Sequence, residues 1–99
     1  MAEPLTSIEP ATGAVLWIGT TGDPSARIEA ARTAWSAWAA KPFAVRVETL
    51  RRFANAARAK IAPFADLIAR ETGKPLWEAR TEVEAVINKV EISIAAYAD

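Results

Sequence analysis

The chain has 99 residues, with 12 Lys and Arg balanced by 12 Asp and Glu, and it has no histidine and no cysteine. This length predicts one small domain with a thin core, and a net charge of zero argues against binding to nucleic acid or an anionic membrane. Without cysteine or histidine, these residues exclude disulfides, structural zinc, thiol catalysis and any histidine-dependent triad.

Two short apolar runs near the N-terminus predict a β-hairpin over about residues 5–18. Between them, residues 9–13 read Glu-Pro-Ala-Thr-Gly, and an early proline with a final glycine is typical of a turn. An isolated two-stranded hairpin is marginally stable in water. We therefore expect a helix, a larger sheet or another subunit to cover it.

A first helix is predicted over about 24–40, because Asp23 is a good N-cap and Pro24 suits the first helical turn. Trp35 and Trp38 recur at helical spacing with smaller apolar residues, which predicts that they pack in the core. The alternative use of this pair is a stacking platform for a ligand.

Prolines set the predicted limits of the next two helices. Pro42 ends the first helix, and an apolar stripe with most arginines on other faces predicts a second helix over about 43–61. Pro63 interrupts that stripe and predicts the start of a short third helix over about 63–72.

The fourth helix, predicted over about 76–98, has the clearest pattern. Gly73 can take the left-handed conformation that ends the preceding helix, and Pro75 suits the start of the next. Its apolar residues form one stripe over residues 76–97, and neither glycine nor proline stops it before residue 99. The pattern predicts a mostly α fold with an N-terminal β-hairpin, cut from a longer sequence.

Few segments of this sequence have a pattern with possible chemistry. Gly73-Lys74 lacks the earlier glycine of a phosphate-binding loop, since Ile68 stands there, and no Gly-x-Gly-x-x-Gly dinucleotide fingerprint occurs anywhere. Glu78 and Glu82 lie one turn apart on the fourth helix. They can do acid–base or cation work, or they can be solvated acids near the positive end of the helix dipole.

Ordered segments along the chain resemble the N-terminal part of an aldehyde dehydrogenase. Residues 10–13 (Pro-Ala-Thr-Gly) match the hairpin turn of that family, and residues 30–38 match its first helix, including Trp38. Residues 46–54 match its second helix. The string Glu-Thr-Gly-Lys-Pro at 71–75, with the residues that follow it, is similar to the branch of the family that oxidises a succinylated semialdehyde in arginine breakdown.

This resemblance implies an N-terminal portion of an α/β NAD-binding domain, within a homo-oligomeric enzyme. It also implies a cysteine nucleophile that attacks the aldehyde, hydride transfer to NAD, and a glutamate base that activates water. In the family those groups lie beyond the matched segment, and this chain has no cysteine. The 99 residues alone are therefore expected to be inactive and not to bind NAD; their partner is the remainder of the chain.

The resemblance further implies a site for a monovalent cation. Some family members hold such an ion with backbone carbonyls just before the hairpin turn and a carboxylate of the long helix. The matching residues are Ser7, Ile8 and Glu82, and hard cations favour oxygen ligands of this kind.

A free-standing helical interaction module without catalytic activity is the competing hypothesis. It predicts a closed, compact bundle, whereas a piece of a larger enzyme should expose extended apolar surface. The start of the chain lacks the basic and apolar regions of a signal peptide, and no apolar run approaches the ~20 residues that span a bilayer. We therefore expect a cytoplasmic protein.

Overall fold

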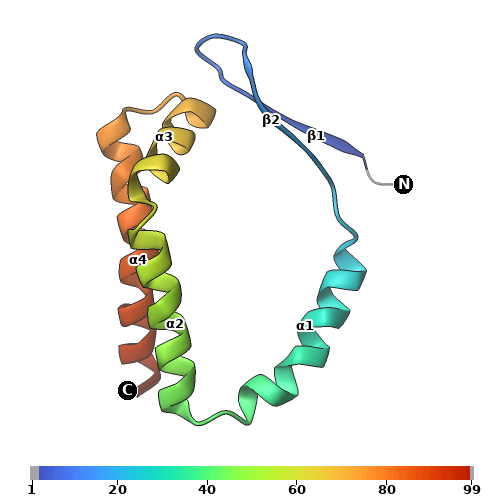
Figure 1. Ribbon diagram of the computed structural model, residues 1–99, viewed down its shortest axis with the longest axis vertical. Coiled ribbons are helices and arrows are strands. Elements are labelled where there is room, and N and C mark those ends of the chain that lie inside the picture. The colour runs from blue at the N-terminus through green and yellow to red at the C-terminus, as the bar shows by residue number, and fades with distance from the viewer. Residues whose placement is uncertain (1–2, 99) are drawn as a thin grey trace.

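The computed structural model describes residues 3–98, which form a β-hairpin followed by four α-helices (Figure 1). The elements in chain order are β1 (Pro4–Ile8), β2 (Val15–Thr20), α1 (Pro24–Ala39), α2 (Phe43–Arg58), α3 (Ile61–Thr72) and α4 (Leu76–Ala98). The predicted fold class, mostly α with an N-terminal β-hairpin, is confirmed.

The hairpin is an antiparallel pair closed by a glycine-containing turn. The N–H of Glu9 donates to the carbonyl of Ala14 at 2.8 Å, and Gly13 takes a φ of 76°, which a residue with a Cβ adopts only with strain. Ser7 lies directly opposite Trp17 in this register. Side chains of directly opposed residues project from the same face of a sheet, so this pair faces one direction.

Local side-chain and backbone chemistry sets two of the helix ends, the start of α1 and the end of α3. The carboxylate of Asp23 accepts a hydrogen bond from the N–H of Ser25 at 3.0 Å, and Pro24 follows it as the first residue of α1. At the end of α3, Gly73 has a φ of 79° and its N–H donates to the carbonyl of Ala69 at 2.8 Å. These are the capping roles that the sequence indicated.

The junction between α2 and α3 differs from the sequence-based boundaries. The second helix ends at Arg58 rather than near residue 61, and the third begins at Ile61, two residues before Pro63. A proline in the first turn is compatible with a helix, because the first N–H groups have no intrahelical acceptor to lose. Pro63 therefore lies inside α3 and does not mark its start.

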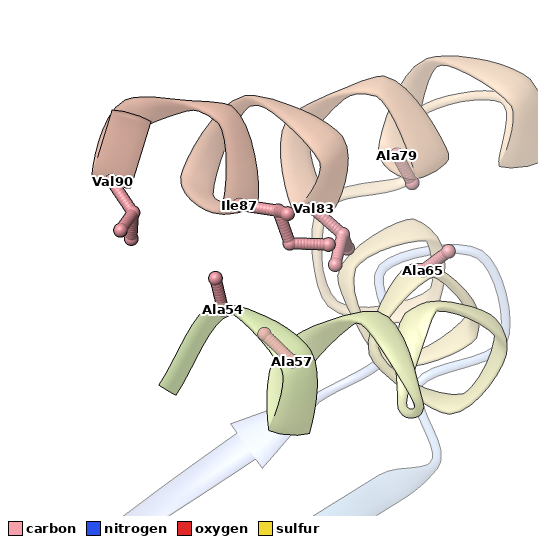
Figure 2. Close-up of a cluster of buried hydrophobic side chains, with 7 residues drawn as sticks. All are labelled: Ala54, Ala57, Ala65, Ala79, Val83, Ile87 and Val90. Atoms are coloured by element: carbon pink, nitrogen blue, oxygen red, sulfur yellow. The ribbon is translucent and has the colours of Figure 1, made fainter. Parts of the chain in front are cut away.

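The core is a small apolar cluster where α4 lies against α2 and α3 (Figures 1 and 2). Figure 2 shows Val83 and Ile87 of α4 pointing toward Ala54 and Ala57 of α2. The small alanine side chains let the helix backbones approach closely, and the branched residues of α4 fill the space. The buried residues of this core are Ala54, Ala57, Ala65, Ala79, Val83, Ile87 and Val90.

Helix α1 contributes no buried residue to this core. Trp35 is 67% exposed and Trp38 is half-buried, so the prediction that both tryptophans pack in the core is wrong for Trp35. The periodicity correctly marks an apolar face, but within residues 3–98 no helix lies against it. Figure 1 shows α1 standing apart from α2 and α4, joined to them only through the turn at its end.

The chain is expanded compared with a globular domain of its size. Its radius of gyration is 17.2 Å, whereas about 13 Å is typical for 100 residues. Its accessible surface is 7561 Å², whereas a compact monomer of 10.7 kDa exposes about 5500 Å². About 2000 Å² of additional surface is therefore open, much of it on apolar side chains.

Candidate functional site

Glu71, the last acidic residue of α3, connects the hairpin to the helices. Its Oε1 accepts a hydrogen bond from the hydroxyl of Ser7 at 2.6 Å and another from the indole N–H of Trp17. The strand register makes both contacts possible, because Ser7 and Trp17 are opposed on one face. A slip by one residue would turn one donor to the other face and break the pair of contacts.

The hairpin is attached to α3 by hydrogen bonds that involve charged side chains. The hydrogen bonds from Ser7 and then Trp17 hold the pKa of the Glu71 carboxyl below its ordinary value. The neighbouring Arg70 donates from Nε to the Glu9 carboxylate of the hairpin turn at 3.2 Å. Consecutive residues at the end of α3 thus bind the strands and the turn of the hairpin.

The same segment is also tied to α4. The ammonium group of Lys74 contacts the Glu82 carboxylate one turn and a half into α4, and this contact raises the pKa of Lys74. Gly73 ends α3 between these two attachments. We call the contacts of Arg70, Glu71 and Lys74 with Glu9, Ser7, Trp17 and Glu82 the hairpin junction.

The hairpin junction explains physically why residues 71–75 stand out in the sequence. Sequence reasoning recognised the helix stop at Gly73 and missed the roles of Glu71 and Lys74. The partners of Glu71 lie 64 and 54 positions away, and local periodicity contains no signal for such pairs. The string Glu-Thr-Gly-Lys-Pro is therefore a structural junction in this chain.

An apolar groove of about 600 Å³ opens beside the hairpin junction, between α2, α3 and α4. Phe53, Phe64 and Val86 line it, and each of these side chains is between 45% and 53% exposed. Glu71 and Glu82 also line the groove. Such a surface suits an apolar partner segment, and no serine, threonine or cysteine lines it.

The predicted cation ligands lie on two elements, each of which contacts the segment 71–74. Ser7 and Ile8 lie in β1, and Glu82 lies in α4. The Ser7 side chain is engaged with Glu71, and the Glu82 carboxylate is engaged with Lys74. The cation site stays a prediction.

In the structure Glu82 is ion-paired with Lys74 at the hairpin junction, which is neither of its two predicted uses, and Glu78 is half-buried in the first turn of α4. Over residues 3–98, no cluster of three or more His, Cys, Asp and Glu residues is arranged to hold a metal ion. In the same part of the chain, no helix combines the length and apolar character needed to cross a lipid bilayer.

The described residues lack the glycine-rich helix start that commonly binds the phosphates of a dinucleotide with a run of backbone N–H groups. The glycines with positive φ in residues 3–98 are Gly13, in the hairpin turn, and Gly73, at a helix end. The groove between α2, α3 and α4 is mainly apolar, so no described residue is assigned to NAD.

Comparison with known proteins decides the family. A family model described as the aldehyde dehydrogenase family matches residues 2–99 of this chain. The chain belongs to that family. The match confirms the resemblance to that family that the ordered segments indicated.

Curated aldehyde dehydrogenases from three bacteria match nearly all of the chain. N-succinylglutamate 5-semialdehyde dehydrogenase of Sphingopyxis alaskensis is 64% identical over 99 residues, which are 100% of this chain and 21% of that enzyme. The enzymes of the same name from Novosphingobium aromaticivorans and Salmonella heidelberg are 60% and 47% identical, over 96% and 89% of this chain and 20% and 18% of theirs. The chain thus spans about a fifth of the length of these relatives, and the resemblance to proteins of this name that the sequence indicated is confirmed.

Proposed function

We propose that this chain is the N-terminal part of the cofactor-binding domain of an NAD-dependent aldehyde dehydrogenase. In this proposal the whole enzyme oxidises N-succinyl-L-glutamate 5-semialdehyde to N-succinyl-L-glutamate in arginine breakdown. The observation that supports this most is the 64% identity over all 99 residues with an enzyme of that name. Identity at this level over a whole segment, including its turns and helix ends, favours the same branch of the family.

The open architecture supports a role inside a larger protein. The apolar faces of α1 and of the groove are exposed, and about 2000 Å² more surface is open than on a compact monomer of this mass. A free-standing interaction module would instead close its helices into a bundle. Burial at the centre of the α4 stripe, at Val83 and Ile87, is the one feature that such a module would share.

In this proposal the chain contributes structure, and the chemistry belongs to other residues. NAD, when bound by residues outside this segment, would accept the hydride from the substrate. The catalytic cysteine and the general base also lie outside it, since the chain has no cysteine. Within residues 3–98, the hairpin junction fixes where the strands stand relative to α3 and α4.

The test is to read the reading frame past codon 99 and to assay the full-length protein. We expect NAD-dependent oxidation of N-succinyl-L-glutamate 5-semialdehyde, with the unsuccinylated semialdehyde as the matched poor substrate and NADP as the cofactor control. The 99-residue chain, purified alone, should show no turnover. A frame without a catalytic cysteine, or a full-length protein inactive on this aldehyde, contradicts the proposal.

The proposal includes the monovalent cation site formed by Ser7, Ile8 and Glu82. The ion would compete with the Lys74 ammonium for the Glu82 carboxylate, because both are cations near one acid. We expect the thermal midpoint of the full-length protein to differ between sodium, potassium and choline chloride at equal ionic strength. Glu82→Gln should remove that difference, and Glu78→Gln should retain it. An ion-independent midpoint contradicts this part.

A cytoplasmic location and a homo-oligomeric state complete the proposal. Sedimentation of the full-length protein tests the second, with one species larger than the monomer as the expected result. Fractionation of the source cells tests the first.

A further inference from the structure

The wall that α3 gives to the apolar groove is a stripe at helical spacing. Phe64, Leu67 and Ile68 lie on this wall, and the groove holds about 600 Å³. Phe64 and Leu67 are exposed, so the described residues leave this part of the stripe open to solvent. Apolar positions three and four residues apart form the face that a surface helix ordinarily buries.

The groove is also continuous with the core of the chain. The buried residues Ala57 and Val83 line it together with Phe53 and Val86, which are half exposed. Buried and open apolar side chains therefore share one surface. A body that fills the groove would extend the core of Figure 2 and remove the open side chains from water.

The chemistry of the groove favours a helix as its occupant. Its walls are α2, α3 and α4, and the backbone N–H and C=O groups inside a helix are paired within that helix. An extended segment would find no backbone partners there, and an unpaired buried N–H or C=O group is costly. A helix pairs its own backbone groups and presents only side chains, so an amphipathic helix fits with its apolar face inward.

We propose that the groove is filled by the apolar face of an amphipathic helix from the remainder of the same polypeptide, outside residues 1–99. The matched relatives are about five times as long as this chain, so about four-fifths of such a polypeptide is available to supply the helix. The extra open surface of about 2000 Å² is more than twice the ~800 Å² per partner of a standard interface between separate proteins. A segment of the same chain also has an effective concentration of up to about millimolar, which favours it over a second copy.

This inference rests on the proposed function only in requiring a longer chain, and it requires no particular activity. In the full-length protein, Lys60, which lines the groove, is replaced by a lysine analogue that carries a photoreactive diazirine. The same replacement at Lys41 is the control, because Lys41 is exposed and precedes α2, at the other end of that helix from Lys60. After irradiation, mass spectrometry identifies the cross-linked peptides, and a denaturing gel separates products within one chain from products between chains. We expect the Lys60 probe to label a peptide outside residues 1–99 of the same chain, and the Lys41 probe not to label that peptide.

Phe64→Ala tests the same contact without a probe, and Asp66→Ala is its control on the same helix. Asp66 is exposed and does not line the groove, and alanine is the best helix former, so neither substitution should weaken α3 itself. We expect Phe64→Ala to speed amide hydrogen exchange in the labelled peptide by at least about tenfold, because local opening sets the exchange rate. Asp66→Ala should leave that rate unchanged. Phe64→Leu keeps an apolar side chain, so it should give a smaller rise, and it serves as the readout where Phe64→Ala fails to fold.

Single aspartate substitutions along the labelled peptide test its helical form. Those that lower the thermal midpoint should recur at every third or fourth residue, since these positions share one face of a helix. A recurrence at every second residue would indicate a strand and overturn the helical occupant.

Other results would also overturn the inference. Labelling between chains would make the occupant a second copy, and labelling of residues 24–39 would place the occupant within this segment. Labelling no stronger from Lys60 than from Lys41, or equal exchange after Phe64→Ala and Asp66→Ala, would leave the groove without a specific occupant. Failure of the unaltered protein to oxidise the aldehyde, with the expected labelling, would reject the proposed function and leave the occupant of the groove standing.

Discussion

Replacing Ile87 with alanine tests whether the α4 contact with α2 and α3 is the core of this chain. Ile87 is 4% exposed and points toward Ala54 and Ala57 (Figure 2). The substitution removes three carbon groups from this contact, each worth about 0.8 kcal/mol of transfer free energy. The facing alanines are too short to fill the space, so a cavity contribution adds to this loss. We expect a destabilisation of about 3 kcal/mol.

The matched control is the same substitution at Ile92, on the same helix. Ile92 is 57% exposed, so little apolar contact is lost, and alanine is the better helix former. We expect Ile92→Ala to change the free energy of unfolding of the isolated chain by less than about 0.5 kcal/mol. In the full-length protein, where the proposed remainder covers this face, Ile92→Ala should become destabilising by about 1–3 kcal/mol.

Urea unfolding of the dilute chain, followed by far-ultraviolet circular dichroism, measures both variants. The isolated chain should be marginally stable or self-associating, so trimethylamine N-oxide can be added equally to all samples to define a folded baseline. Equal midpoints for Ile87→Ala and Ile92→Ala would refute the assignment of the core. A dilute wild-type monomer that unfolds cooperatively at high temperature would refute the dependence on further residues.

Three further predictions concern Gly73, Ala79 and Glu71. Gly73→Ala should destabilise by about 1 kcal/mol in urea titration, purely through its φ of 79°, since no atom lies near the added Cβ; Gly73→Asn should lose less. Ala79→Leu should destabilise by about 1–3 kcal/mol because Ala79 is 0% exposed, whereas Ala85→Leu on the exposed face should be nearly neutral; equal midpoints would contradict close packing there. The folded-state pKa of Glu71 is depressed, so hairpin attachment should be complete above the unfolded value of 4.5 and be lost as the pH falls through the folded value. Tryptophan fluorescence should report that loss, and an acid transition unchanged by Glu71→Gln would assign it to other carboxylates.

Local signals in the sequence predicted the elements, because their causes are local. Asp23 caps α1 with its own side chain, and Gly73 ends α3 by a conformation that glycine adopts freely. Treating Pro63 as a boundary places the start of α3 two residues too late, because the first turn of a helix accommodates proline.

The arrangement of those elements could not be predicted in the same way. An apolar face on a helix, such as the face that carries Trp35, indicates that the helix packs against a partner. The helical spacing of the apolar residues does not say whether that partner lies within these 99 residues. The attachment of the hairpin depends on Glu71 meeting donors 54 and 64 positions away, which only the folded chain brings together. The sequence thus allowed the protein family to be predicted, but it did not allow the contacts within the candidate site to be predicted.

The position of the core along the chain also affects synthesis. Within the described residues, every buried side chain lies between Ala54 and Val90. A ribosome adds about 5–20 residues per second from the N-terminus, so the hairpin and α1 emerge seconds before the helix that completes the core. During that interval Trp17 and Trp35 are held in water on an unfinished polypeptide. The half of the chain that adds nothing to the core is therefore the half most in need of a chaperone during translation.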